Sequence, residues 1–395
     1  MIFRTIGAAA CIGALAACST PYGSPVFAAK AGGDTSFPGV AAAMERDRPL
    51  DVLFVHGMCT HDATWAAQAI QQLAAALGAR ATDALRPTPV PGTEVVLYQQ
   101  TLDSERGQVR ANALLWSPVT TPLKQQLCYD ESDKSAICKA SSGPAYPYDR
   151  ASLNKSLKDG ILDDCLSDAM IYQGKSRDQV SEQVQKAILL TAAGSQGADA
   201  AAATERAGAV PASVPFVVVA ESLGSKIAFD AIYKLVTSPD AATAKGGQAT
   251  FDRTTQIFMG ANQLPILALA DQSLPGAPAM AQARTGEPAY PTDPIAALIA
   301  HRQAGLRTPD IVAHAAPRPP QVIAFSDPND LLSYTLAPSQ QAAVAGYPVV
   351  DVIVSNTTTW LGLFELPTTA HTSYLTNDAV ARLIACGHPA SATCR

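Results

Sequence analysis

Ser222 is the residue of this chain whose surroundings best suit nucleophilic chemistry. It follows the apolar run 217–220 and precedes a segment with helical spacing, and the positions two before and two after it, Ala220 and Gly224, are small. A serine in a strained turn between a buried strand and a helix projects its hydroxyl above the sheet, where larger flanking side chains would collide with the neighbouring elements. The pattern predicts a nucleophile, and the alternative is a serine that only caps the helix.

A serine nucleophile needs a general base, and the base needs an acidic partner; both residue types occur downstream at predicted strand ends. His371 follows the apolar run 349–354, and Asp330 follows the run 322–325. The histidine can accept the serine proton, while the carboxylate fixes the histidine tautomer and stabilises the imidazolium. We therefore expect Ser222, Asp330 and His371 to be the catalytic residues.

Other titratable residues near these positions receive other roles. Asp327 is the alternative acid, but the Pro-Asn that follows it favours a turn. Glu221 is expected to be solvated or structural, with at most a role in fixing nearby loops, and His61 to have no direct role. The remaining histidines are weaker candidates for the base: His314 precedes the strand before Asp330, His301 lies in a helical insertion, and His388 lies in the loop between Cys386 and Cys394.

The segment after residues 50–55 can supply hydrogen-bond donors for a developing negative charge. His56 and Gly57 end that apolar run, and the glycine lets the backbone pass close to a substrate. The segment resembles the H-G turn of α/β-hydrolases, and this resemblance implies that the N–H groups of Met58 and Leu223 form an oxyanion hole. We expect His56 to hold the loop rather than to act as a base.

These residues must be positioned by alternating strands and helices. A helix beginning after Asp62 and ending at Gly78 is expected after the first strand, another over 226–233 after Ser222, and a last one from near Tyr374. Such alternation is typical of an α/β fold with a mostly parallel central sheet flanked by helices. The predicted strands cover residues 50–55, 93–99, 214–220, 256–259, 322–325 and 349–354.

Two stretches depart from this alternation of strands and helices, and we interpret them as insertions in a domain spanning 49–395. Residues 101–209 are polar with a helical pattern, and residues 268–320 are rich in Pro and Ala with one helix near 295–302. Insertions between sheet elements commonly become caps over the crevice at the carboxyl ends of the strands. We expect a helical cap, and with it a bulky or lipid substrate.

The order of these motifs resembles the α/β-hydrolase superfamily, lipases and esterases in particular. The resemblance covers residues 49–102 and 211–384, and it departs from the family's G-x-S-x-G pattern at Ala220. It implies the α/β-hydrolase fold and cleavage of carboxylic esters through an acyl-enzyme on Ser222, without a cofactor or metal. Thioesters and amides need the same machinery, and a catalytically silent envelope lipoprotein that uses the scaffold for binding is the alternative from another class.

The N-terminus reads as a targeting segment. An apolar run over 6–15 ends in Leu15-Ala16-Ala17-Cys18, which resembles the bacterial lipobox, so residues 1–18 are expected to form a lipoprotein signal with Cys18 as the lipidated residue. Residues 19–48, rich in Ala, Pro, Gly and Ser, are expected to be a tether. The resemblance implies a cell-envelope protein, lipid-anchored at the outer membrane; plain secretion with cleavage after Ala28 is the alternative.

Cysteine usage favours an oxidising compartment. Besides Cys11 and Cys18 six cysteines remain, and fifteen pairings are possible. Because 128 and 138 lie close in sequence, as do 386 and 394, we favour those two pairs and assign the remaining two to each other. The expected disulfides are Cys128–Cys138, Cys386–Cys394 and Cys59–Cys165.

Composition bounds the remaining possibilities. With 395 residues, of which 48% are hydrophobic, the chain can bury a large core. Its net charge of −6 and the lack of a long basic run argue against nucleic acid as a partner. The expected partners are an ester or lipid substrate and a membrane, and the oligomeric state is left open.

Overall fold

The computed structural model describes most of the chain from Cys18 onward. The described residues are 18–29, 33–132, 135–139, 143, 146–194, 199–272, 290–305, 319–336, 347–391 and 394. The predicted signal segment before Cys18, and His314, lie outside them.

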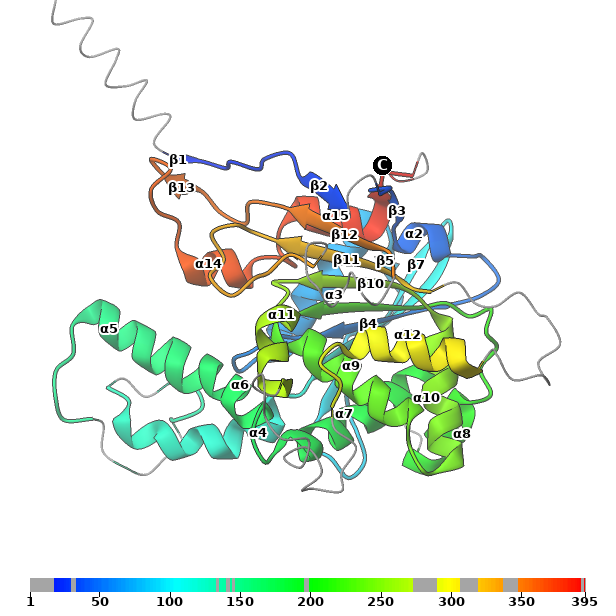
Figure 1. The fold of residues 1–395 in the computed structure, drawn as a ribbon, viewed down its shortest axis with the longest axis horizontal. Helices are drawn as coiled ribbons and strands as arrows, with labels where there is room; N and C mark the ends of the chain where they lie inside the picture. Colours follow the sequence, from blue (N-terminus) through cyan, green and yellow to red (C-terminus); the bar gives the residue numbers. More distant parts are fainter. Residues whose placement is uncertain are drawn as a thin grey trace, which may run out of the picture.

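A mixed sheet forms the centre of the molecule, with helices on both faces (Figure 1). Within the described residues it has ten strands in the order β2-β12-β11-β10-β9-β4-β8-β7-β5, with β6 paired to β7. The inner strands from β12 to β8 are parallel, and β2 and β7 add to them antiparallel. The fold is thus α/β, as predicted. The parallel strands are β4 (Leu50–Val55), β8 (Gly107–Leu115), β9 (Phe216–Glu221), β10 (Thr254–Gly260), β11 (Gln321–Ser326) and β12 (Val349–Ile353); the others are β2 (Val26–Ala29), β5 (Arg80–Ala81), β6 (Arg86–Pro89) and β7 (Val96–Ser104).

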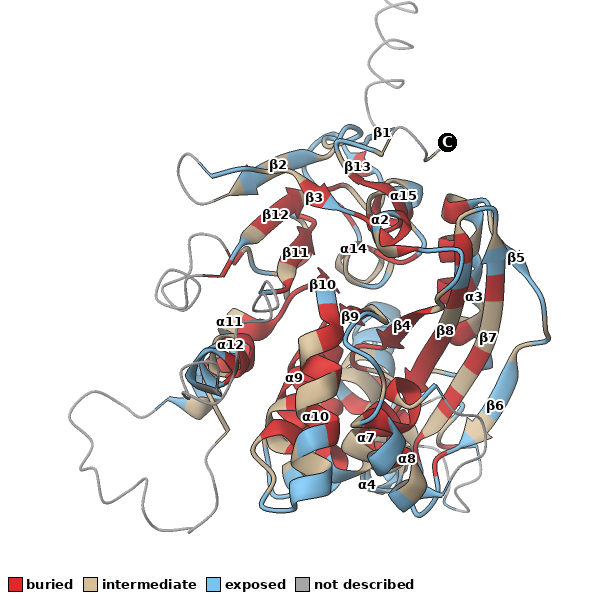
Figure 2. Ribbon diagram, turned by 90° about the vertical axis from the view of Figure 1, so that its right-hand side faces the viewer, coloured by how far each residue is buried: buried red, intermediate tan, exposed pale blue. Residues whose placement is uncertain are grey.

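Two apolar cores lie on the two faces of this sheet, and Figure 2 shows the buried strands between helices. Strands β4 and β9 are buried at every position, because helices cover both of their faces. One core contains α3 (Ala63–Leu77), α15 (Asp378–Cys386) and α2 (Val40–Ala43). The other contains α7 (Arg177–Ala192), α8 (Ala200–Ala207), α9 (Leu223–Val236), α11 (Leu264–Leu267) and α12 (Pro294–Gly305), next to α10 (Ala241–Arg253).

The ends of α3 are confirmed. The Asp62 carboxylate accepts a hydrogen bond from the N–H of Thr64 at 2.8 Å, and Gly78 ends the helix with φ of 62°, a conformation that favours glycine. The last helix differs from its prediction. Two helices, α14 (Pro367–Thr372) and α15, replace the one expected from near Tyr374, because Asn377 caps a new start.

Strand β8 is a correction to the predicted insertion 101–209, since the sheet continues through residue 115. The polar residues of β8 concealed it. Arg110 pairs with Asp51 of β4 at 2.6 Å, and the Asn112 side chain accepts a hydrogen bond from Gln99 of β7 at 2.8 Å, so each has a partner on a neighbouring strand. The strand expected over 93–99 also extends to Ser104 as β7.

The part of the insertion that does leave the sheet is shorter than expected. Helices α7 and α8 join the helical layer, because Val180, Val184 and Ile188 pack into its core. The projecting arm therefore runs from Ser117 to Tyr172 (Figure 1). It contains α4 (Ser117–Lys124), η1 (Gln125–Asp130), α5 (Ser152–Ser156), η2 (Leu157–Leu166) and α6 (Ser167–Tyr172). In the second insertion, η3 (Ala268–Asp271) and α12 are described, and α12 packs into the same core as α9.

Residues 19–48 are not a free tether. Val26–Ala29 forms β2 beside β12, and β3 (Phe37–Pro38) pairs with β14 (Gly387–His388). Phe37 and Val40 are buried, so these apolar residues draw the segment into the core despite its Ala, Gly and Pro content. Even β1 (Cys18–Ser19) pairs with a strand of the domain, β13 (Thr359–Trp360).

All three predicted disulfides are present. They join Cys59 to Cys165, Cys128 to Cys138 and Cys386 to Cys394. In the part of the chain that the structure describes, no helix has both the length and the apolar character needed to cross a membrane.

Candidate active site

The candidate site lies where two neighbouring parallel strands lead to opposite faces of the sheet. Strand β4 continues into α3 on one face, while β9 continues into α9 on the other. The two connections diverge at the carboxyl ends of the strands and leave a crevice there. Ser222 follows β9 directly, and His56 and Gly57 follow β4.

Ser222 occupies the strained turn that the sequence predicts. Its φ is 52° and its ψ is −128°, and its N–H donates to the carbonyl of Gly260 at 2.8 Å. Small neighbours are required: a Cβ on Gly224 would lie 2.1 Å from the His56 carbonyl oxygen, and one on Gly57 would lie 2.8 Å from the Ser222 Cβ. The turn therefore costs backbone strain and excludes larger residues around the serine.

Ser222, His371 and Asp330 form one hydrogen-bonded chain. His371 Nε2 lies 3.0 Å from the Ser222 Oγ, and His371 Nδ1 lies 2.8 Å from the Asp330 Oδ1. Since a carboxylate can only accept, Nδ1 carries the proton and Nε2 is free to take one from the serine. The three side chains come from three separate segments, after β9, on α14 and after β11.

Asp327, the alternative acid, makes the turn. Its carboxylate accepts from the N–H of Asn329 at 2.9 Å and from the N–H of Asn356 at 2.6 Å, while Asp330 faces the histidine. Asp327 thus joins the loop after β11 to the loop after β12 and makes no contact with His371 among the hydrogen bonds of the described residues.

Tyr374 is a site residue that the sequence reasoning missed. Its buried hydroxyl donates to the Asp330 Oδ2 at 3.0 Å and accepts from the N–H of Asp327 at 2.7 Å. A Cβ on Gly260 would lie 2.9 Å from the Tyr374 Cβ, so the ring packs directly on the end of β10. The sequence contained one signal for this role, namely a tyrosine three positions after the predicted base His371.

The backbone around the serine offers hydrogen-bond donors. Leu223 is the first residue of α9, and N–H groups of a first helical turn have no partner within the helix. Met58 follows Gly57 and lines a cleft of about 60 Å³ together with Ser222 and His371. The predicted donors Met58 and Leu223 thus flank the nucleophile.

His56 has the structural environment that we expected for it. Its Nε2 accepts from the N–H of Trp116 at 3.0 Å, its Nδ1 donates to the carbonyl of Gly57 at 2.8 Å, and its ring stacks on the indole of Trp116. Complete burial lowers its pKa well below the ordinary value, so it is neutral. His61 also holds the loop, since its Nε2 donates to the Met58 carbonyl at 3.0 Å.

Glu221 is buried beside the nucleophile rather than solvated. Its carboxylate accepts from the indole N–H of Trp65 on α3 at 3.1 Å. Burial raises the pKa of this carboxyl to about 7, with the nearby His371 acting in the opposite direction. Glu221 therefore links the strand that carries Ser222 to the helix after the Met58 loop.

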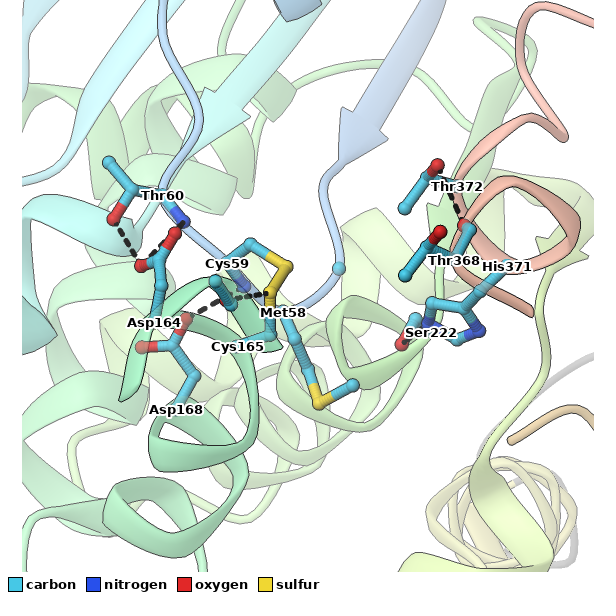
Figure 3. The surroundings of a disulfide bond; sticks show 12 residues. Met58, Cys59, Thr60, Asp164, Cys165, Asp168, Ser222, Thr368, His371 and Thr372 are labelled. Atoms are coloured by element: carbon cyan, nitrogen blue, oxygen red, sulfur yellow. Dashed lines mark hydrogen bonds between the residues drawn. A yellow bond between two sulfur atoms is a disulfide. The ribbon is translucent and has the colours of Figure 1, made fainter. Parts of the chain in front are cut away.

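The Met58 loop is tied to the projecting arm by a disulfide and by carboxylates (Figure 3). Cys59 is bonded to Cys165, and its N–H donates to Asp168 at 2.9 Å. Thr60 donates through its N–H and its hydroxyl to Asp164. Lys124, which is fully buried, binds both carboxylates at 2.7 and 3.2 Å, so one buried ammonium group offsets part of their negative charge inside the joint.

One group of possible metal ligands occurs among the described residues, and it lies in the arm. It consists of Cys128, Glu131 and Cys138. The two cysteines form a disulfide, so their sulfur atoms are not thiolate ligands.

Comparison with known proteins adds no relative: a scan against protein-family models, a search of curated proteins and a search of solved structures each returned no match.

Proposed function

We propose that this protein is a serine hydrolase that cleaves carboxylic esters through an acyl-enzyme on Ser222. The observation that carries the proposal is the unbroken hydrogen-bonded chain from Ser222 through His371 to Asp330. In this mechanism His371 Nε2 takes the serine proton as Oγ attacks the ester carbonyl, and Asp330 stabilises the resulting imidazolium. The Met58 and Leu223 amides hold the oxyanion, and water then releases the acid.

The local geometry supports the α/β-hydrolase resemblance. The strained turn with positive φ at Ser222, the close approach of Gly57 and Gly224, and the chain order Ser, Asp, His all match the nucleophile-elbow arrangement. Ala220 in place of the first glycine is buried within β9, where its methyl group is accommodated in the core.

A fluorophosphonate probe tests the nucleophile. The wild-type protein should be labelled on Ser222, and Ser222→Ala should lose labelling. Ser225→Ala is the matched control, because Ser225 is a buried serine on the same helix whose hydroxyl has no hydrogen-bond partner, and it should keep full labelling. Labelling of wild type no greater than that of Ser222→Ala would refute the enzyme proposal and favour a binding role.

The bond that is cleaved needs a separate measurement. A series of nitrophenyl esters of increasing acyl length, with the matching anilides and thioesters, should show turnover of the esters above the other two classes. Faster turnover of anilides would replace the esterase proposal with an amidase.

We also propose that Cys18 carries a lipid that attaches the protein to the cell envelope. Cys18 is exposed and not disulfide-bonded. Cleavage after Ala28 would remove most of β2, which is paired with β12, whereas cleavage before Cys18 leaves the fold intact. Mass spectrometry of the mature N-terminus should find a diacylglyceryl Cys18, and an unmodified Ala29 would contradict the proposal.

A further inference from the structure

A short loop beside Cys18 exposes an unusual concentration of apolar side chains. We call residues 360–366 the apolar loop; its sequence is Trp-Leu-Gly-Leu-Phe-Glu-Leu. Its five apolar side chains are at least half exposed, and Leu363 is 87% exposed. Single exposed leucines are ordinary on a protein surface, but a contiguous group of this kind indicates an interaction site. The five side chains are Trp360, Leu361, Leu363, Phe364 and Leu366.

The loop is an ordered turn that holds these side chains outward. The N–H of Trp360 donates to the carbonyl of Phe364 at 2.7 Å, and the N–H of Leu363 donates back to the carbonyl of Trp360 at 2.9 Å. Leu361 has φ of 52°, a conformation that costs energy for a branched side chain. The backbone of the loop is therefore strained in the conformation that exposes the apolar side chains to solvent.

The charge distribution of the loop is the reverse of that of an ordinary surface turn. Glu365 is its one charged residue, and that side chain is 5% exposed and accepts from the Asn329 amide at 2.7 Å. The carboxylate thus points inward to the loop after β11, while the apolar groups point outward. An outward-facing surface without charge is better suited to contact the acyl region of a bilayer than to bind a charged partner.

The apolar loop lies against the start of the described chain. Cys18 pairs with Trp360 in the β1–β13 ladder, and the Thr359 hydroxyl donates to the Ser19 carbonyl at 3.1 Å. Figures 1 and 2 both place β1 and β13 at one end of the molecule, away from α8 and α10. A lipid on Cys18 would therefore enter the membrane directly beside the loop. The diacylglyceryl group proposed for Cys18 already supplies two acyl chains, so a second contact beside it would orient the domain on the membrane.

We infer that the apolar loop inserts into the surface of a lipid bilayer as a second membrane contact next to Cys18. The loop leads within one residue into α14, which carries His371. Insertion would hold the candidate active site at the membrane surface instead of letting the domain swing from its N-terminus. This inference goes beyond the proposed hydrolase activity, because binding does not require Ser222.

Tryptophan fluorescence tests the inference directly. The chain has three tryptophans, of which Trp360 is strongly exposed, whereas Trp116 is buried and Trp65 half-buried. The full chain carrying Cys18→Ser, which cannot be lipidated, is mixed with neutral phosphatidylcholine vesicles, some brominated on the acyl chains. The emission should shift to shorter wavelength and be quenched by the bromines, and Trp360→Phe should keep vesicle binding but lose the quenching.

Matched variants separate the loop from other apolar surfaces. The triple variant Leu361→Ser/Leu363→Ser/Phe364→Ser should bind vesicles roughly tenfold or more weakly, since each buried side chain of this size contributes favourably. Leu153→Ser, an equally exposed leucine on the projecting arm, should bind like the parent. Every variant keeps the same N-terminus, so any binding by residues 1–17 cancels in the comparison.

Three outcomes would overturn the inference. Vesicle binding without quenching of Trp360 would place the contact elsewhere, and an equal loss in Leu153→Ser would place it on the arm. A dimer of the parent that becomes a monomer in the triple variant, seen by sedimentation without lipid, would make the loop a contact between two copies. Unchanged fluorophosphonate labelling and thermal stability of the triple variant verify its fold, so the inference and the hydrolase proposal fail separately.

Discussion

The two walls of the candidate site are held in different ways. The first wall, residues 56–61 after β4, contributes only backbone groups, and the Cys59–Cys165 disulfide and the buried Lys124 tie it to the arm. The second wall, residues 326–331 after β11 and residues 367–374 on and after α14, contributes Asp330 and His371 and is held by hydrogen bonds, many of them to carboxylates.

The difference fits what each wall would do in the proposed hydrolase. Oxyanion donors act through fixed position, so a covalent tie would serve the first wall. In the proposed mechanism a proton moves between Ser222 and His371, and hydrogen bonds around Asp330 can hold the histidine while its charge changes. The geometry of the second wall thus depends on the ionisation of its carboxylates. Glu365 is an example of this dependence, because burial and the neighbouring Asp327 raise its pKa to about 7.

Asp330→Asn breaks the second wall most severely. An asparagine can donate its amide N–H to the histidine Nδ1 and favour the wrong tautomer, so we expect kcat for ester hydrolysis to fall by about 10⁴. The matched control is Asp327→Asn, three residues away, which keeps one of the two side-chain acceptors of the turn and should change kcat by less than roughly tenfold. Equal losses in the two variants would mean that Asp330 only holds the loop.

Cys59→Ser/Cys165→Ser tests the first wall. The disulfide closes a separation of 106 residues, so its removal should cost about 4 kcal/mol of unfolding free energy. We also expect kcat to fall roughly tenfold, because the Met58 amide loses part of its support while the Asp164 and Asp168 contacts remain.

The control for the disulfide is Cys386→Ser/Cys394→Ser, which removes the bond between the last residue of α15 and Cys394, a separation of 8 residues. This variant should have a lower melting temperature in thermal unfolding and an unchanged kcat. A folded Cys59→Ser/Cys165→Ser protein with full kcat would show that the covalent tie does not support the chemistry.

Glu221→Gln tests, through pH, the link between β9 and α3 beside the first wall. The folded-state pKa of Glu221 is raised to about 7 from an ordinary 4.5, so between these values the folded protein holds a proton that the unfolded chain has released. Stability of the wild type therefore falls as pH rises through this window, and the deficit persists above it. Glutamine can still accept from Trp65, so the variant should be more stable than wild type at pH 8, by at most on the order of 3 kcal/mol, and equal to it at pH 4.5.

Thermal unfolding at several pH values measures this difference, with the exposed Glu205→Gln on α8 as the control that should show no such trend. A constant difference between Glu221→Gln and wild type from pH 4.5 to 8 would mean that folding does not raise the pKa of Glu221.

The sequence predicts most of the site because Ser222 and Asp330 stand close to the ends of apolar strands and His371 follows the last of these strands. Parallel strands bring their carboxyl ends to one edge, so chain order, together with the resemblance to α/β-hydrolases, predicts that the three residues meet. The three disulfides followed from spacing and elimination. These are signals carried by local sequence.

What the sequence concealed depends on partners that are distant along the chain. The sequence suggests an exposed polar residue at Arg110, but the structure pairs Arg110 with Asp51. It suggests a linker at β2, but the structure pairs β2 with the edge of β12. The sequence leaves Glu221 either solvated or structural, and its contact with Trp65 of α3 shows that it is structural. In each case the environment comes from tertiary packing and not from neighbours in sequence.

Tyr374→Phe tests whether the Tyr374 hydroxyl positions Asp330, and it has the smallest expected effect. Losing the hydroxyl removes one donor to Asp330 and leaves the buried N–H of Asp327 without its acceptor, at a cost of about 1–2 kcal/mol in stability. If Tyr374 positions the acid, kcat should also fall roughly tenfold while KM is unchanged. Tyr347→Phe removes a comparable buried hydroxyl bond, to Asp293 at 3.1 Å, and should lower stability only. Equal kcat values for the two variants would mean that Tyr374 contributes packing only and does not position Asp330.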